Sequence, residues 1–502
     1  MIVAAPDLLV DTIRADLCVI GTGPGGAMVA MLAAEAGLKV VALEAGAFVT
    51  PGDMNQREAD MFPRLLWEAG GRTTVDKAIR IHQGHGVGGS SLHNLNLCKR
   101  VPPGIRARWA ADRGEGPLWD DLYDEVEALL EVKDVDPAMV NRHNALLAAG
   151  AAALGWEHGL LRHNRTGCIG SGYCEIGCAF DAKNNALKKL IPRGVRAGLA
   201  VVSLAQAVSV DHADGRVRGV DAVILDARTR QPLGRLRIEA PRVCVSASAT
   251  GTPALLLRSG VPDPSDTTGN SLRIHPAVVA AGDFEEPVYA WRGVPQSVEC
   301  TEFLRLDEEN GPRTWVVPAF AHPVGVATLV PGLGEHRAVM QRYPHLGALT
   351  AMIHDRTRGT VRPRGDLGVA ISYTPDDEDR AELRRGLAYA CRLLFAAGAR
   401  RVLVPAGRAI EVTRPDEIAQ VLAVDAELSA VHPMGSVPMG QDPTTAAVGL
   451  TGRHHHLDGL WVSDASLFPT SIGVPPQLSV YALGLHVGRQ LVLDPSPDRG
   501  TK

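Results

Sequence analysis

Three glycines near the start of the chain have the spacing of a phosphate-binding turn. Gly21, Gly23 and Gly26 lie at G-x-G-x-x-G spacing in GTGPGG, which also contains Gly25. The first glycine of this pattern allows a tight turn, the second lets the backbone approach a pyrophosphate, and the third lets a helix pack closely on a strand. Glu44 follows at the distance where a carboxylate accepts hydrogen bonds from ribose hydroxyls, and an acid there disfavours NADP.

The flanking residues predict the strand–helix–strand unit that such a turn needs. DLCVI at 16–20 is typical of a buried strand, and KVVAL at 39–43 indicates a second strand that ends at Glu44. The apolar stretch between them predicts a helix whose N-terminus faces the phosphates. Together these features predict dinucleotide binding, although the motif alone does not separate FAD from NAD.

Two clusters raise the question of a metal site. Cys168, Cys174 and Cys178 lie within TGCIGSGYCEIGCAFDAK, but their spacing lacks the paired C-x-x-C pattern of zinc or iron–sulfur sites. We expect structural thiols or one disulfide there, with a metal or a substrate-proximal loop as the alternatives. The three consecutive histidines at 454–456 cannot share one ion if they lie in a strand, because neighbours point to opposite faces. We expect a surface strand there, and no metal in the protein.

The composition excludes several classes of protein. The 502 residues are 45% hydrophobic and 21% charged, with a formal net charge of −5, which marks neither a nucleic-acid binder nor a polybasic membrane protein. No apolar stretch is long enough to span a membrane, and the acidic start does not resemble a signal peptide. We therefore expect a cytoplasmic protein without nucleic-acid or membrane partners.

Five segments, in order along the chain, resemble the glucose–methanol–choline (GMC) family of FAD-dependent alcohol oxidoreductases. They are the glycine turn, GHGVGGSSLHN at 84–94, VCVSASATGTPALLLRSG at 243–260 with GNSLRIHP at 269–276, HPMGSVPMGQDP at 432–443, and DGLWVSDASLFPTSIGVPPQLSVYALG at 458–484. The Cys/Gly-rich stretch is similar to one in relatives that act on long-chain and other bulky alcohols. Residues 280–420 match the family only loosely.

The resemblance implies an α/β fold, in which a Rossmann-like FAD-binding domain is interleaved with an α+β substrate domain. The FAD-binding domain would comprise residues 1–105, 196–277 and 425–494, and the substrate domain residues 106–195 and 278–424. Residues 495–502 would be a disordered tail. Beyond the glycine turn and Glu44, the cofactor contacts implied by the family are Gly88, Gly89, Ser90, His93, Asn94, Val208, Asp464 and Ala465.

The resemblance also places one histidine at the reacting carbon. His432 stands at the family's H-P-x-G-[ST] position, and we expect it to be the base that takes the alcohol's hydroxyl proton, titrating near neutrality. The family's second active-site His or Asn is replaced by Pro475, which has no polar side-chain group. Gln477 or a residue of the substrate domain is then expected to orient the hydroxyl, unless His432 works alone.

His93 precedes the motif's Asn94, where choline-type and pyranose-type relatives carry a histidine joined covalently to the flavin. A covalent bond and a histidine that only packs beside the ring are both open at this point.

The reaction expected is oxidation of a small-molecule alcohol by FAD, with O2 or another electron acceptor. A GMC-fold lyase with structural FAD and a non-catalytic flavin-binding protein are the alternatives, and a flavin disulfide reductase is disfavoured because no redox-active cysteine pair follows the first strand–helix–strand unit. Acidic residues would suit a cationic or aminosugar alcohol if they faced the site; these are Asp283, Glu285, Glu286 and the run Asp376–Asp379. Sugars, sterols and long-chain alcohols remain open as substrates.

Overall fold

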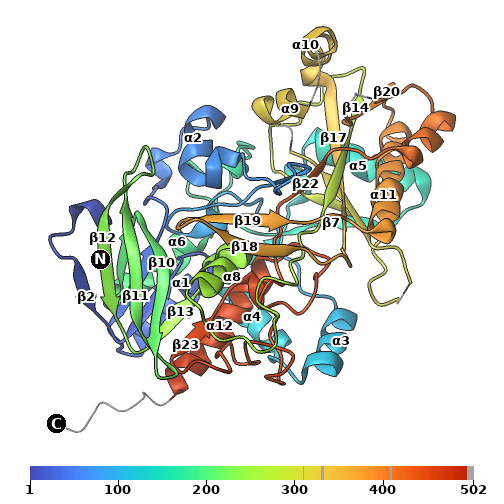
Figure 1. Cartoon of the computed structure of the whole chain (residues 1–502). Helices are drawn as coiled ribbons and strands as arrows, with labels where there is room; N and C mark the ends of the chain where they lie inside the picture. Colours follow the sequence, from blue (N-terminus) through green and yellow to red (C-terminus); the bar gives the residue numbers. More distant parts are fainter. Residues whose placement is uncertain (309, 321, 330–332, 408–409, 495–502) are drawn as a thin grey trace, which may run out of the picture.

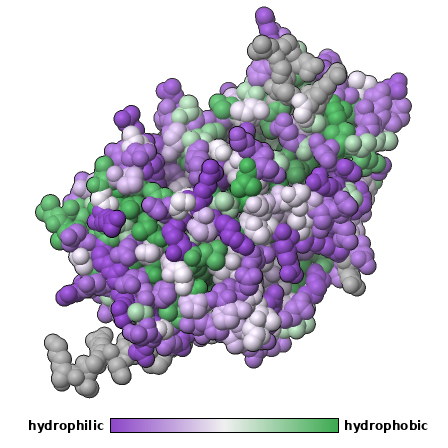
Figure 2. Space-filling model, viewed as in Figure 1, coloured by the Kyte–Doolittle hydropathy of each residue, from purple (hydrophilic) through white to green (hydrophobic). Residues whose placement is uncertain are grey.

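The structure is a computed structural model that describes residues 1–308, 310–320, 322–329, 333–407 and 410–494. The long α11 (Asp377–Ala396) lies at one end of the molecule and the N-terminal strands lie at the other, with further strands between them (Figure 1). Charged and polar residues predominate on the face shown in Figure 2, with smaller apolar areas between them.

A six-stranded sheet, parallel throughout, carries the glycine turn. Its order is β1-β9-β4-β3-β13-β23. The strands are β1 (Ile2–Ala4), β3 (Leu17–Ile20), β4 (Val40–Glu44), β9 (Ala200–Ser203), β13 (Val243–Val245) and β23 (Leu460–Val462). Because the carboxyl ends of parallel strands meet at one edge, Gly21, Glu44, Ser246 and Ser463 gather there, which is where open α/β sheets bind ligands.

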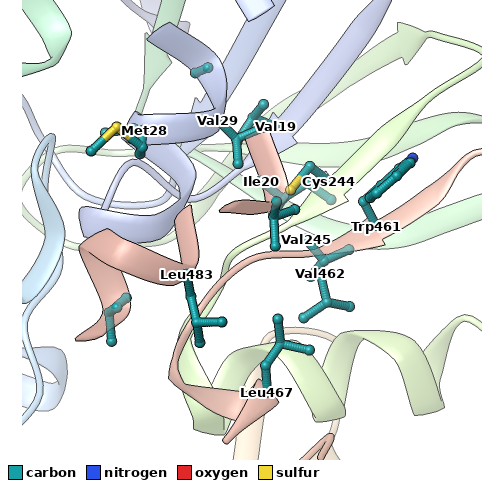
Figure 3. Packing of buried hydrophobic residues seen from close by; sticks show 14 of the residues in the cluster. Val19, Ile20, Met28, Val29, Cys244, Val245, Trp461, Val462, Leu467 and Leu483 are labelled. Atoms are coloured by element: carbon teal, nitrogen blue, oxygen red, sulfur yellow. The ribbon is translucent and has the colours of Figure 1, made fainter. Parts of the chain in front are cut away.

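The C-terminal part of the chain packs directly on the first strand–helix–strand unit. Helix α12 (Gln477–Leu493) lies against α1 (Pro24–Glu35). Figure 3 shows side chains of β3 and α1 meeting those of β13, β23 and α12 in one apolar core. The labelled residues are Val19, Ile20, Met28, Val29, Cys244, Val245, Trp461, Val462, Leu467 and Leu483. This burial brings residues beyond 430 to the edge of the sheet that holds Gly21.

A second large sheet is mainly antiparallel. Its order is β21-β20-β14-β17-β16-β15-β7, and β22 and β5 join it through β14. The strands are β5 (Ile79–Ile81), β7 (His158–Leu160), β14 (Ala277–Asp283), β15 (Val298–Cys300), β16 (Thr314–Pro318), β17 (Leu346–Ile353), β20 (Arg401–Val404), β21 (Ile410–Val412) and β22 (Leu428–Ala430). Helices α11 and α5 (Arg142–Leu154) pack on this sheet with a separate apolar core.

The remaining elements connect these layers. A four-stranded sheet has the order β10-β11-β12-β2, and β18 pairs with β19 and β6 with β8. These strands are β2 (Thr12–Arg14), β6 (Val132–Asp134), β8 (Arg162–Asn164), β10 (Ala205–Ala213), β11 (Arg216–Leu225), β12 (Pro232–Glu239), β18 (Thr360–Arg364) and β19 (Gly368–Ser372). The other α-helices of the described residues are α2 (Glu58–Leu65), α3 (Pro103–Arg113), α4 (Trp119–Leu130), α6 (Ala186–Lys189), α7 (Ile191–Arg196), α8 (Ser248–Arg258), α9 (Pro323–Leu329) and α10 (Leu333–Gln341).

The predicted fold class is confirmed as α/β with parallel and antiparallel sheets. The strands predicted at 16–20 and 39–43 are β3 and β4, and the helix predicted between them is α1. The domain ranges stay a prediction, and the tail 495–502 lies outside the described residues. Among the described residues, no helix combines the length and apolar character that a membrane crossing requires.

The expectation of a surface strand at 454–456 is wrong in two respects. These residues belong to a loop, and His454 is buried. The ring of His455 bonds the carbonyl of Gly440 and that of His456 the carbonyl of Pro443. Nδ1 of His454 accepts from the backbone N–H of His456, so all three rings have protein partners.

Candidate active site and cofactor cavity

One cavity of about 1070 Å³ runs from the glycine turn to His432. Gly21, Gly23, Gly25 and Glu44 line one part of it, and His432, Pro475 and Gln477 line another. The parallel sheet, the 84–94 loop and the second sheet all contribute to its walls. Its volume lies at the top of the range usual for ligand sites, as a dinucleotide together with a substrate would require.

The glycine turn has the steric form expected of a phosphate-binding loop. Gly21 has a φ of +97°, and a Cβ there would overlap the carbonyl of Ser246. A Cβ on Gly25 or Gly26 would overlap the backbone of Ser463 or of Gly21, respectively. At Gly23 a Cβ would have Gly89 Cα as its nearest protein neighbour, at 3.8 Å. Gly23 therefore has room with respect to the protein, and its missing side chain leaves space in the cavity.

Glu44 is buried at the end of β4, and both its oxygens accept hydrogen bonds from the protein. Oε2 accepts from the N–H and the hydroxyl of Thr22, at 3.1 and 2.7 Å. Oε1 accepts from the N–H groups of Gly46 and Gly86, at 2.9 and 3.2 Å. The carboxylate thus joins the glycine turn to the 84–94 loop, and it also lines the cavity.

Replacing Glu44 should therefore weaken cofactor binding. We expect Glu44→Ala to lower the FAD affinity of the apoprotein, because the ribose loses an acceptor and two loops lose their common anchor. Reconstitution with FAD, followed by absorbance, measures this. Glu35→Ala removes an exposed carboxylate at the end of α1 and serves as the control. An FAD affinity equal to that of the unaltered protein would take Glu44 out of the cofactor site.

The second glycine-rich loop packs on the first. Gly88 and Gly89 have φ values of +112° and +57°, and a Cβ on Gly89 would lie 2.6 Å from Gly23 Cα. The hydroxyl of Ser90 accepts from the N–H of Gly84 at 3.0 Å. Gly89 and Ser90 line the cavity, whereas Gly88 does not. The backbones of the two loops meet at Gly23 and Gly89, where neither residue has a side chain. The surface left there suits a flat ring or a pyrophosphate.

His93 presents an unpartnered nitrogen inside this site. Its Nε2 is buried without a hydrogen-bond partner, and the ring occupies the space that a side chain at Gly84 would fill. Burial, and then the nearby Lys183 ammonium, lower the pKa of His93 to about 3. The imidazole is therefore neutral at physiological pH, and an unpaired polar atom in a cavity wall is what a bound group would satisfy.

Gln477 is placed differently from the expectation that it orients a substrate hydroxyl. Its Oε1 accepts from the Asn94 side chain at 2.6 Å, and its Nε2 donates to Leu97 O at 2.7 Å and to Asn164 Oδ1 at 3.1 Å. Both amide hydrogens are thereby used. The side chain braces Asn94, and the first residue of α12 is thus tied to the 84–94 loop.

His432 lines the cavity and pairs with a second histidine, His275. Their Nδ1 atoms lie 3.2 Å apart, with the rings nearly perpendicular. Nε2 of His275 accepts from the N–H of Gly473 at 2.9 Å. Because Nε2 of His275 is an acceptor, neutral His275 carries its hydrogen on Nδ1 and donates it to Nδ1 of His432. Nδ1 of His432 is then an acceptor, so neutral His432 carries its own hydrogen on Nε2.

Electrostatics keep this pair of rings neutral. Burial lowers the pKa of His275 to about 3, and burial followed by His275 holds the pKa of His432 well below its usual value. The expectation of a group that titrates near neutrality therefore does not hold for the protein without ligands. The neutral imidazole predominates throughout the physiological range, and any rate that needs it should fall only in acid.

Asp464 and Ala465 line the cavity beside β13 and α8. Asp464 Oδ2 accepts from the Ser248 N–H at 2.8 Å and the Thr252 hydroxyl at 2.5 Å. Val208 does not line the cavity; the preceding residues of β10, 205–207, do so instead. A bulge between Ala207 and Ser209 shifts the register of this strand, which sequence alone could not place.

The wall nearest the second sheet is mainly apolar. It is made by residues of the 95–97 segment and of β14, β16 and β17, together with a few loop residues: Leu95, Leu97, Ala277, Val279, Gln296, Trp315, Ala319, Phe320, Ala348, Thr350 and Met352. None of the acidic residues that would have suited a cationic substrate lines the cavity. Asp283 pairs with Arg342 and Arg401, and Asp379 pairs with Arg313.

The cysteines are free thiols in this structure. Cys174 is buried, whereas Cys168 and Cys178 are partly exposed. Among the residues that the structure describes, no group of histidine, cysteine, aspartate or glutamate side chains has the arrangement of a metal site.

Two histidines near the site were not predicted from the sequence, His275 and His354. His354 lies near Gly473, and Nδ1 of His354 is buried without a hydrogen-bond partner. His275 has a φ of +50°, which is uncommon for a residue with a side chain. His275 lies in GNSLRIHP at 269–276, within a segment that resembles the family, but nothing in that segment indicates a role for its side chain, and no motif contains His354.

Comparisons with known proteins agree with this architecture. Two family models, both described as GMC oxidoreductase, match residues 62–277 and 355–484. An uncharacterized GMC-type oxidoreductase of Mycobacterium tuberculosis is 36% identical over 493 residues, covering 95% of this chain and 76% of its own length. A long-chain-alcohol oxidase of Arabidopsis thaliana is 26% identical over 514 residues, covering 95% of this chain and 68% of its own length.

Solved structures show the same fold. Pyridoxine 4-oxidase from Mesorbium loti superposes with a TM-score of 0.73 at 20% sequence identity, and the match covers 95% of this chain and 98% of that one.

Proposed function

Because this chain belongs to the GMC oxidoreductase family and is an FAD-dependent oxidoreductase, we propose that it oxidises the CH–OH group of a neutral, largely apolar small-molecule alcohol to an aldehyde or ketone. The observation that carries this proposal is the single cavity that joins a dinucleotide-binding turn to His432. When bound, FAD supplies the acceptor for the hydride of the alcohol carbon.

The chain's own residues have separable tasks in this proposal. The glycine turn and Glu44 hold the adenosine and pyrophosphate part of the cofactor, and the loop from Gly88 to Asn94, with Asp464 and Ala465, holds the rest. Gln477 keeps Asn94 in place through the bond between their side chains. The walls of β14, β16 and β17 exclude water from the reacting carbon.

His432 is proposed to act on the hydroxyl through Nε2, because its Nδ1 is engaged by His275. As a base it would take the hydroxyl proton there. To act as a base through Nε2, His432 must carry its own hydrogen on Nδ1 and donate it to Nδ1 of His275. His275 would then carry its hydrogen on Nε2, and it could no longer accept the N–H of Gly473. Leaving a buried N–H unpaired costs about 1–3 kcal/mol.

The hydrogen bond from Gly473 to His275 favours a second role for His432, as a hydrogen-bond donor. With its hydrogen on Nε2, neutral His432 can donate to the alcohol oxygen as that oxygen gains negative charge, which requires no tautomer exchange. Both roles depend on the same side chain, and a His432→Gln variant, which keeps an N–H donor but is no base, separates them.

The substrate class is proposed from the cavity wall. Apolar side chains predominate on the wall formed by the second sheet, with Gln296 and Thr350 as polar exceptions, although the carboxylates of Glu58, Glu175 and Glu427 also line the cavity. The acidic residues considered above do not line it. Among the relatives, a long-chain-alcohol oxidase and a 2-methyl-1,2-propanediol dehydrogenase of Mycolicibacterium austroafricanum both act on uncharged alcohols by name. The proposed electron acceptor is O2 or another oxidant.

His93 is proposed as the site of a covalent bond to FAD. Its neutral, unpartnered Nε2 could form such a bond. The new N–C bond would replace one C–H bond of a methyl group on the flavin's dimethylbenzene edge, whose proton is lost and whose two electrons pass to the flavin and then to the same electron acceptor that reoxidises it in turnover. We then expect trichloroacetic acid to leave yellow colour in the protein pellet, and His93→Ala to release the colour into the supernatant. A colourless pellet from the unaltered protein would reject the bond and leave FAD binding itself intact.

The GMC-fold lyase remains the alternative from another class of enzyme. Only an oxidoreductase loses its flavin absorbance when its substrate is added without oxygen, so that experiment separates the two.

A further inference from the structure

Lys183 is a buried cation directly behind the loop that carries His93 and Asn94. Its side chain is among the largest fully buried ones, with 1% of its surface exposed. Nζ donates to the carbonyl oxygens of Leu92, Asn94 and Cys174, at 2.9, 2.6 and 3.0 Å. Three acceptors use all three hydrogens of an ammonium, whereas a neutral amine has only two. The geometry is therefore that of a charged Lys183.

No anion neutralises this charge directly. Within the part of the chain that the structure describes, no carboxylate forms an ion pair with Lys183, and burial lowers its pKa. A buried charge without an ionic partner is costly, and a neutral amide can tie loops together at lower cost. The next residue does so, since Asn184 donates to Leu130 O at 2.9 Å. Tying the loops together therefore does not by itself explain a lysine at position 183.

The field of Lys183 reaches the cavity wall. The ammonium is, after burial, the largest cause of the lowered pKa of His93. His93 and Asn94 both line the cavity, and the carbonyl of Asn94 is the nearest of the three acceptors. The carboxylate of Glu175 and the thiols of Cys174 and Cys178 act on Lys183 in the opposite sense, but none of them bonds to Nζ.

We propose that Lys183 is a positioning residue that holds the Leu92–Asn94 turn and supplies a fixed positive charge to FAD as it takes up electrons. The ring system of the cofactor gains negative charge on reduction, and a cation preorganised in a water-excluded site stabilises that charge. The inference rests on the proposed function only in that FAD is the electron acceptor. It does not depend on which alcohol is oxidised.

The test compares charge with hydrogen bonding in the FAD-loaded protein. Lys183→Gln keeps amide donors for the carbonyls but removes the charge, and Lys183→Arg keeps the charge. Lys189→Gln removes a lysine from the adjacent α6 and is the matched control. The readouts are FAD content, the FAD midpoint potential against reference dyes, and the Kd for sulfite, which adds to oxidised flavin and leaves it negatively charged.

We expect Lys183→Gln to retain FAD while its midpoint potential falls and its sulfite Kd rises at least about tenfold, a change of about 1.4 kcal/mol. Lys183→Arg and Lys189→Gln should stay close to the unaltered protein. A Lys183→Gln protein that keeps its FAD, potential and sulfite affinity would overturn the proposal and leave Lys183 as a structural tie.

A second measurement needs no variant and applies even if Lys183→Gln does not fold. FAD reduced in the unaltered protein should remain anionic at and below neutral pH, as read from its absorbance during a pH titration. Reduced FAD that takes up a proton in the same range as free reduced FAD would contradict a fixed cation beside it. Neither result depends on alcohol oxidation, so this proposal and the proposed function can fail separately.

Discussion

His432→Ala is expected to keep FAD and fold but to lose most of the flavin reduction by an alcohol. A group that moves a proton in the transition state contributes typically about 10²–10⁴-fold, which corresponds to about 3–5 kcal/mol. Pro475 offers no polar group and Gln477 is occupied by Asn94 and Leu97, so we expect a loss in the upper part of this range. Stopped-flow reduction without oxygen measures it.

Two further variants interpret the loss. His432→Gln retains an N–H donor but cannot act as a base near neutral pH. If His432 is a base, this variant should be as slow as His432→Ala; if His432 donates to the alcohol oxygen, it should be clearly faster than His432→Ala. Pro475→Asn should matter far less than either, because the present site works without that side chain. Reduction of His432→Ala within about threefold of the unaltered rate would place the main proton-handling group elsewhere.

The pH dependence of this step follows from the direction of the pKa shift. Burial and His275 lower the pKa of His432, so the neutral form predominates from neutral to alkaline pH. The rate of flavin reduction should therefore be flat there and should fall only as the medium becomes acidic enough to protonate the ring.

The second large effect is expected from two glycines of the same turn. A Cβ on Gly26 would overlap the Gly21 carbonyl and press on Ser246, and overpacking of this kind typically costs about 1–3 kcal/mol, sometimes more. We expect Gly26→Ala to lower the thermal midpoint of the apoprotein. Gly23→Ala should leave that midpoint nearly unchanged, since its Cβ has room with respect to the protein.

The affinity for FAD is a second property in which we expect a large effect, this time from Gly23→Ala. Gly23→Ala should weaken FAD binding by about tenfold or more, or about 1.4 kcal/mol, because the added methyl lies where the pyrophosphate must approach the backbone. Gly116→Ala, in open space outside the turn, is the control. Normal FAD affinity in Gly23→Ala would show that the cofactor does not pass over this residue.

The parts of the fold that follow from local rules were predictable from sequence. The turn at Gly21–Gly26 follows from a short glycine pattern between two strand-like runs, although the space at Gly21 and Gly25 is closed by Ser246 and Ser463 from distant parts of the chain. The resemblance to GMC proteins supplied what local rules do not give, namely that the C-terminal part of the chain returns to the first strand. Figure 3 shows Trp461, Val462, Leu467 and Leu483 packed in the core that this strand shares.

Other features depend on contacts between distant residues. The hydrogen bonds from Gly473 to His275 and from His275 to His432 join three segments. His275 lies in a segment that resembles the family, but the sequence gives no sign that its ring contacts His432. Gln477 was expected to face substrate, but its amide is used by the 94–97 segment and by Asn164. The acidic run at 376–379 was open to either interpretation. In the structure Asp376 caps α11, Glu378 pairs with Arg356 and Asp379 pairs with Arg313.

The most direct test of alcohol oxidation is a set of alcohols added to the FAD-loaded protein without oxygen, with the flavin absorbance followed in time. The set should include neutral apolar primary and secondary alcohols, a diol, a sugar and a cationic amino alcohol. We expect at least one neutral apolar alcohol to bleach the oxidised flavin and to yield the matching aldehyde or ketone, with the cationic alcohol inactive. An FAD-loaded protein that consumes an alcohol while its flavin stays oxidised, or that is reduced by none of these classes, would contradict the proposal that this chain is an alcohol oxidoreductase.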